Sequence, residues 1–264
     1  MKTLKTKSAL LAAFIALAAG SAAAQSDVII TEVDPAGSGT GSSSYNADWF
    51  ELTNVGTTAQ SIVGWSMLDN HAASNSASPY SGTISIANAS SGSVALSGIS
   101  SLAAGQSAVF IENTGLNSAA TAAEIAKFES IWFGANVPAN LAIGTYDSTG
   151  KTSVGLSQTA DMVNIFSGTA VGSSLVASVA FGNDGSATPL ATWDNTAGLN
   201  NATLTVKSVA GVNGAFVSTN GAEVGSPGVV FAVPEPTGFA LALLGFGALG
   251  MRRRGKKSSG SLRA

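Results

Sequence analysis

One alternating run constrains the fold more than any other feature of this chain. Residues 48 to 54 read Asp-Trp-Phe-Glu-Leu-Thr-Asn, which places Trp49 and Glu51 on one face of an extended segment and Phe50 and Leu52 on the other. Successive side chains of a β-strand point to opposite faces, so the run predicts a strand. A second run, Asp27 to Val33, is rich in β-branched residues and closes at Asp34-Pro35, because proline cannot donate to a ladder. Together they predict a mainly β domain.

Two further segments extend this prediction. Residues 59 to 68 indicate a strand broken at Gly64, with Ile62, Trp65 and Leu68 as core positions. Residues 117 to 133 indicate one amphipathic helix that ends at Gly134, because its large apolar side chains recur at helical spacing: Ile125, Phe128, Ile131 and Trp132. We interpret the helix as a cover for the core, with a partner-binding helix as the alternative.

The two ends of the chain indicate export. Residues 1 to 24 form a predicted signal peptide, with three lysines before an apolar run from Ala9 to Ala19. Ala22 and Ala24 match the small-residue pattern that signal peptidase requires, so we expect cleavage after Ala24. A retained N-terminal anchor is the alternative.

The other end has three parts in order. Residues 233 to 236 read Val233-Pro234-Glu235-Pro236, an uncharged run follows from Thr237 to Met251, and the basic residues Arg252, Arg253, Arg254, Lys256 and Lys257 close it. The run is slightly short of the roughly 17 to 25 apolar residues of a membrane-spanning helix, so we expect weak insertion. The basic cluster predicts that residues 258–264 stay cytoplasmic and that the chain before Val233 lies outside.

Between these ends, residues 25–232 are long enough for one sizeable domain. This part carries 3 basic and 14 acidic residues, a formal charge of −11. Nucleic-acid binding depends on Lys and Arg that neutralise phosphates, so we expect no nucleic-acid partner. The chain has no cysteine, and its stability must therefore come from an apolar core without disulfides.

The C-terminal parts resemble the PEP-CTERM sorting signal of Gram-negative bacteria over residues 233–257. The resemblance implies recognition by an exosortase, a membrane protease that cuts near the motif and releases or re-attaches the protein. An ordinary C-terminal membrane anchor is the alternative.

The exported part resembles the lamin-tail domain, an immunoglobulin-like β-sandwich. The matching blocks are Ile29–Val33, Asp48–Asn54 and Ile62–Trp65 with Leu68-Asp69, followed by Leu102–Ile111, Asp161–Phe166, Ser178–Phe181 and Gly225–Gly228. Ala104 departs from the family, which has proline there. The resemblance implies a sandwich over residues 25–232 with one inserted short helix, and a second insertion over residues 70–93.

The sequence offers little for catalysis. His71 is the lone histidine, and a triad, a zinc-binding histidine pair or a nucleophile elbow has no support in the pattern. Four acids, Glu32, Asp34, Asp48 and Glu51, lie on two segments that could be neighbouring strands, and such proximity is the minimum for a carboxylate mechanism. The family resemblance instead implies that Glu32, Asp48 and Glu51 serve the fold.

Two binding options remain open. Oxygen-rich turns around Asp147, Asp184 and Asp194 are calcium candidates, although none has EF-hand spacing and each also fits a plain turn. Four aromatic residues that we expect in loops could stack on sugars: Tyr45, Tyr80, Tyr146 and Trp193. Scattered rings are the alternative to a sugar platform.

The sequence thus predicts an exported, non-enzymatic surface or extracellular-matrix protein that acts as a structural, adhesive or ligand-binding module. Its expected partners are signal peptidase, exosortase and exopolysaccharide or other envelope components, and no cofactor is expected. It would be membrane-anchored before processing and then reach the cell surface, outer membrane or extracellular matrix. The alternative function is a secreted calcium- or carboxylate-dependent hydrolase.

Overall fold

The computed structural model describes residues 27–35, 47–69, 84, 86, 92–113, 118–149, 154–158, 160–183, 190–200 and 202–229. The chain divides into two units, Met1–Phe231 and Ala232–Ala264, and every described residue belongs to the first. No helix in the described ranges is long and apolar enough to cross a membrane. The predicted apolar run Thr237–Met251 lies outside the described residues.

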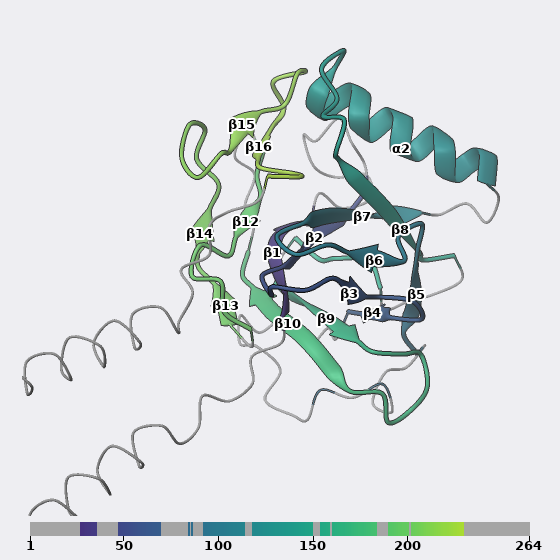
Figure 1. The fold of residues 1–264 in the computed structure, drawn as a ribbon. Helices are drawn as coiled ribbons and strands as arrows, with labels where there is room; N and C mark the ends of the chain where they lie inside the picture. Colours follow the sequence, from purple (N-terminus) through teal and green to yellow (C-terminus); the bar gives the residue numbers. More distant parts are fainter. Residues whose placement is uncertain are drawn as a thin grey trace, which may run out of the picture. The chain divides into compact units, whose positions relative to one another are not determined.

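The described part is built mainly from short strands (Figure 1). In chain order they are β1 Val28–Asp34, β2 Trp49–Asn54, β3 Gln60–Ser61, β4 Ser66–Leu68, β5 Val94–Ser97, β6 Ser101–Leu102, β7 Ser107–Asn113, β8 Ala142–Asp147, β9 Asp161–Phe166, β10 Leu175–Phe181, β11 Leu190–Ala191, β12 Trp193–Asp194, β13 Ala202–Leu204, β14 Val206–Lys207, β15 Phe216–Val217 and β16 Glu223–Gly225. The helix α2 spans Ser118–Phe133.

One 11-stranded sheet runs in the order β13-β10-β9-β4-β5-β8-β7-β2-β1-β12-β14. Small sheets accompany it in the orders β11-β16-β15 and β3-β6. Side chains from both halves of the large sheet share one apolar cluster, so the sheet folds over and its halves face each other. This arrangement confirms the mainly β sandwich with one helix that the sequence predicts.

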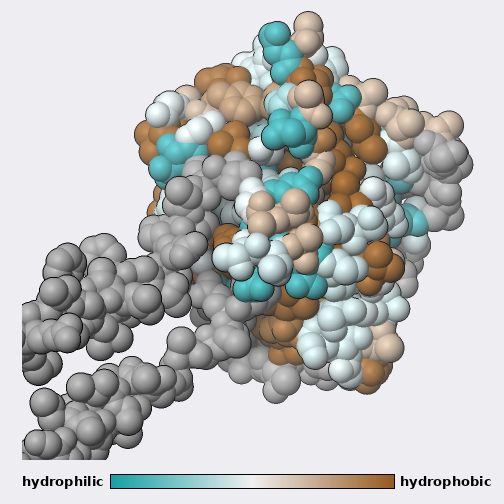
Figure 2. All heavy atoms as spheres, viewed as in Figure 1, coloured by the Kyte–Doolittle hydropathy of each residue, from teal (hydrophilic) through white to brown (hydrophobic). Residues whose placement is uncertain are grey.

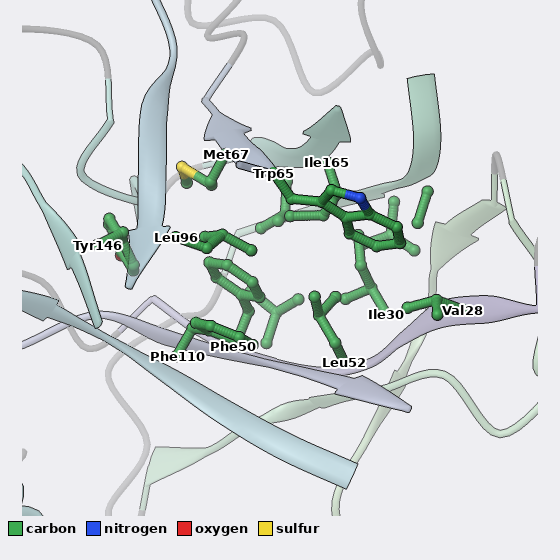
Figure 3. Close-up of a cluster of buried hydrophobic side chains, with 14 of the residues drawn as sticks. Val28, Ile30, Phe50, Leu52, Trp65, Met67, Leu96, Phe110, Tyr146 and Ile165 are labelled. Carbon is green, nitrogen blue, oxygen red and sulfur yellow. The ribbon is translucent and has the colours of Figure 1, made fainter. Parts of the chain in front are cut away.

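The interior of the sandwich contains the alternate residues of the strands that face it. Phe50 and Leu52 of β2 point inward with Ile30 of β1, and Trp65 and Ile165 lie across from them (Figure 3). Phe50 stacks on Phe110 with ring centroids 5.6 Å apart. The alternation predicted for residues 48 to 54 is confirmed, since Trp49 belongs to a second cluster on the outer face.

The helix α2 covers that outer face. It connects β7 to β8, which pair in parallel, and a parallel pair needs a crossover connection of this kind. Phe128 and Trp132 meet Trp49 edge-on, with centroids 5.8 and 5.6 Å away. Such pairs contribute about 0.5–1.5 kcal/mol beyond the area they bury. The predicted core-covering helix is confirmed, and its stop at Gly134, where φ is +59°, is confirmed as well.

The strand predicted over residues 59 to 68 is also confirmed. It appears as β3 and β4, and the backbone between them turns at Gly64 with a φ of +80°. Ile62, Trp65 and Leu68 are buried as predicted. Most of the predicted insertion over residues 70–93, including His71, lies outside the described residues.

Candidate functional site

Three carboxylates form a row across neighbouring strands on the outer face of the sheet. Glu32 on β1 lies directly opposite Glu51 on β2 and opposite Asp194 on β12. All three side chains are buried. Directly opposed like charges destabilise a sheet, so this carboxylate row (Glu51, Glu32 and Asp194) needs specific compensation.

The compensation for Glu32 comes from the turn that follows β16. Its Oε1 atom accepts a hydrogen bond from the backbone N–H of Ser226 at 2.8 Å, and its Oε2 atom accepts one from the Ser226 hydroxyl at 3.0 Å. The hydroxyl of Thr192 donates to Oε1 as well. Glu32 therefore binds one end of the turn Gly225–Gly228.

Glu51 binds the other end of the same turn. Its Oε2 atom accepts a hydrogen bond from the backbone N–H of Gly228 at 2.6 Å, and its Oε1 atom accepts one from the hydroxyl of Thr31 at 2.7 Å. Hydroxyl contacts then link Thr31 to Thr53 at 2.9 Å and Thr53 to Ser107 at 2.6 Å. The network ties the closing turn to β1, β2 and β7.

The fit of the turn explains the glycine at its start. A Cβ added at Gly225 would lie 2.7 Å from Oε1 of Glu32 and 2.9 Å from a ring atom of Trp132. Only glycine fits between the carboxylate row and the helix α2. Gly228 has a φ of +77°, a conformation that other residues rarely adopt.

Burial controls the protonation of the row. It raises the pKa of Glu32 to about 7, against the hydrogen bonds from Thr192 and Ser226 that lower this pKa. Burial likewise raises the pKa of Glu51 to about 8, and the charge of Glu32 raises it further. The pKa of Asp194 is raised by burial too. The row can therefore hold protons near neutral pH.

A second group of charges adjoins the row at the end of β1. Burial raises the pKa of Asp34 well above its usual range, and the nearby carboxylates of Glu223, Asp48 and Glu32 raise it further. Lys207 on β14 lies with its Nζ atom 4.4 Å from the ring centroid of Trp193. Burial lowers the pKa of Lys207 to about 8, while the charge of Asp34 opposes the change.

The structure places the four acids on or directly beside the first two strands. β1 and β2 pair, and Glu32, Asp34, Asp48 and Glu51 are all buried. Asp48 accepts a hydrogen bond from the backbone N–H of Leu156. Backbone and hydroxyl groups from distant segments donate to Glu32, Glu51 and Asp48, so these acids join separate parts of the fold.

The calcium candidates stay predictions. Asp147 ends β8 and accepts a hydrogen bond from the backbone N–H of Thr149 at 2.8 Å, as in a plain turn. Asp194 lies in β12, and Asp184 falls outside the described residues. Across the described ranges, no group of three or more His, Cys, Asp or Glu side chains could hold a metal ion.

The prediction that Tyr146 and Trp193 lie in loops is wrong. Tyr146 is on β8, fully buried, with its ring 5.5 Å from that of Phe50. Trp193 is on β12 and packs against Phe181 with centroids 6.3 Å apart. Both rings lie in the core because their strands pair into the large sheet. The other two candidate sugar-stacking rings, Tyr45 and Tyr80, lie outside the described residues.

Sequence reasoning did not identify the donors that complete the site. Thr192, Ser208 and Ser226 surround Glu32, and the hydroxyls of Thr192 and Ser208 lie 2.7 Å apart. Thr192 and Ser208 are of residue types that are common along the chain, so no local signal marks them, whereas Ser226 lies in the block Gly225–Gly228 that the family resemblance singled out. The residues that the sequence predicts to direct processing lie outside the described residues; they are Ala22, Ala24, Val233, Pro234, Glu235, Pro236, Arg252, Arg253 and Arg254.

Comparison with known families gives one match. The family described as Lamin Tail Domain matches residues 21–213, a range that contains all three members of the carboxylate row and ends before the closing turn. No curated protein and no solved structure matches the chain.

The carboxylate row makes stability depend on pH. The folded pKa of Glu51 is about 8, above its usual 4.5, so between these values the folded state binds more protons than the unfolded state. The free energy of unfolding should therefore fall as pH rises from 5 to 8, by about 1.4 kcal/mol for each unit of pKa difference. Glu51→Gln should reduce this fall. Urea unfolding at pH 5 and pH 8 measures the fall in the free energy of unfolding in the wild type and in the variant.

Thr31→Val is the matched control, because it removes a donor to Glu51 and leaves the carboxyl group in place. It should lower stability and keep the dependence on pH. The contribution of Lys207 to the pH dependence of stability has the opposite sign. Because its folded pKa is lowered to about 8, stability rises with pH only above about 8, outside the range measured. An equal fall between pH 5 and pH 8 in wild type and Glu51→Gln would contradict the assignment of the buried proton.

Proposed function

Because the chain belongs to the lamin tail domain family, we propose that it is an exported, non-enzymatic β-sandwich module with a structural, adhesive or ligand-binding role. Its place is the cell surface, the outer membrane or the extracellular matrix. Its binding partners there are exopolysaccharide or other envelope components. In this proposal the protein can also bind calcium through loop oxygens.

The observation that carries the non-enzymatic role is the use of the acids. Glu32 and Glu51 are fully buried, and each binds one end of the turn Gly225–Gly228. A general acid or base must reach the proton that it transfers in a bound substrate. Carboxyl groups that are closed under a backbone turn serve the fold, which leaves binding to the loops that the sandwich displays.

The sorting role is supported by the sequence beyond the domain. The motif Val233-Pro234-Glu235-Pro236 begins four positions after Val229, the last described residue. A protease that recognises the motif would therefore cut beyond β16, the last strand that the structure describes, and leave the described strands joined. In this proposal signal peptidase acts after Ala24, exosortase acts at the motif, and the apolar run Thr237–Met251 anchors the chain until then.

A secreted carboxylate-dependent hydrolase is the alternative function. The observation in its favour is the pair of opposed glutamates whose raised pKa values, about 7 and about 8, suit a general acid at neutral pH. The hydrolase requires that a substrate reach Glu51 or Glu32. This requirement separates the two functions experimentally.

Incubation with exopolysaccharide prepared from the producing cells distinguishes the two functions, the non-enzymatic binding module and the hydrolase. We expect the exported protein to be retained on the polymer without shortening it, and Glu51→Gln to be retained equally. Polymer length, measured by size-exclusion chromatography, is the readout. Shortening of the polymer by wild type but not by the folded Glu51→Gln variant would establish the hydrolase instead.

Intact mass and cell fractionation test the sorting role. In a host with exosortase, the protein should lose its C-terminal residues near Pro234 to Pro236 and leave the inner membrane. Without exosortase it should keep them. Replacing Arg252, Arg253 and Arg254 by Ser should block processing, because the positive cluster holds the C-terminus on the cytoplasmic side. Identical masses and locations in both hosts would show an ordinary anchored domain.

A further inference from the structure

Four exposed valines lie along the segment from β14 to β15. Val206, Val209, Val212 and Val217 are 44, 59, 51 and 46 % exposed. Figure 2 shows hydrophobic side chains gathered over this connection, at the upper left of the view. We call these four residues the valine face. Single exposed apolar residues are ordinary, but exposed apolar residues that gather into one contiguous patch mark an interaction surface.

The backbone of the connection holds the valines outward. Hydrogen bonds join the N–H of Val212 to the carbonyl of Val209 at 2.9 Å and the N–H of Ala215 to the carbonyl of Val212 at 2.9 Å. Ala215 is buried beneath the connection, while Val209 and Val212 remain exposed. These turns fix the exposure of the valines as a feature of the fold.

The charge of this region differs from that of the rest of the domain. No acidic residue occurs between Asp194 and Glu223, although the exported part has 14 acidic residues. Lys207 is the charged residue within that interval. An acidic domain is repelled by an anionic bilayer, and the apolar face whose segment carries Lys207 and no acidic residue is the side that approaches such a bilayer most easily.

Val229, the last residue that the structure describes, lies beside this face. Val229 packs against Gly214 within the connection, since a Cβ added at Gly214 would lie 2.6 Å from Cγ1 of Val229. Eight residue steps then lead to Thr237, where the apolar run begins. Fully extended, eight steps span at most about 28 Å. A chain held in a bilayer from Thr237 onward therefore keeps the valine face near the bilayer surface.

We propose that the valine face rests on the surface of the lipid bilayer that holds the C-terminal run, before processing releases the domain. This inference rests on the membrane attachment under the proposed function. Four valines provide only weak affinity for lipid. The short connection supplies a high effective concentration, so weak contact is sufficient.

The absence of cysteine from the chain permits a specific test. Val212→Cys, labelled with a fluorescent dye, reports on the valine face in the full chain without its signal peptide. Val171→Cys is the matched control, because Val171 is 73 % exposed in the connection from β9 to β10 at the lower right of Figure 1. Each chain is reconstituted in vesicles of phosphatidylethanolamine and phosphatidylglycerol, with and without a lipid that carries a quencher near its headgroup.

Quenching of the label at position 212 by about twofold, with little change at position 171, is the expected result for a face held at the bilayer surface. Adding Val209→Asp to the labelled chain should reduce the quenching.

Equal quenching at the two positions, or none at either, in chains that float with the vesicles would overturn the inference. Energy transfer between labels on two copies, without lipid quenching, would make a second copy the occupant and overturn it too. Chains that do not float with vesicles would contradict the membrane attachment itself, and the inference with it.

Discussion

The burial of opposed carboxylates under a backbone turn is the interaction on which the arrangement of this domain depends. Glu32 and Glu51 face each other across β1 and β2, where like charges repel. Their hydrogen bonds to Ser226 and Gly228 join the last segment of the domain to its first two strands. Residues at the two ends of the domain are thereby held together, and the fold is closed without a disulfide.

The outer face of β1 and β2 is consequently divided into an apolar part and a polar part, each packed against a different segment. Trp49 and the aromatic residues of the helix α2 form the apolar part, and the carboxylate row with its hydroxyl partners forms the polar part. Gly225 lies where the two meet, against both Glu32 and Trp132. A side chain larger than glycine at this position would disturb both parts together.

Much of this fold follows from local pattern, and the site does not. The alternation at residues 48 to 54 placed Phe50 and Leu52 on one face, which the structure puts in the interior, and helical spacing placed Phe128 and Trp132 on α2. Alternation says nothing of what covers the polar face. Glu51 binds Gly228, which is 177 positions away, and Asp194, predicted in a surface turn, lies in a strand opposite Glu32. Register between distant strands is set by the whole fold, so a local pattern cannot reveal it.

The central claim is that the buried glutamates hold protons for the fold, and a carboxyl-carbon NMR titration of the folded protein tests it most directly. Glu32 and Glu51 should titrate near the values that burial gives them, about 7 and about 8, and both should return toward 4.5 when the chain is unfolded. Titration of both residues near 4.5 in the folded protein would show that both are ionised at neutral pH, and would contradict the account.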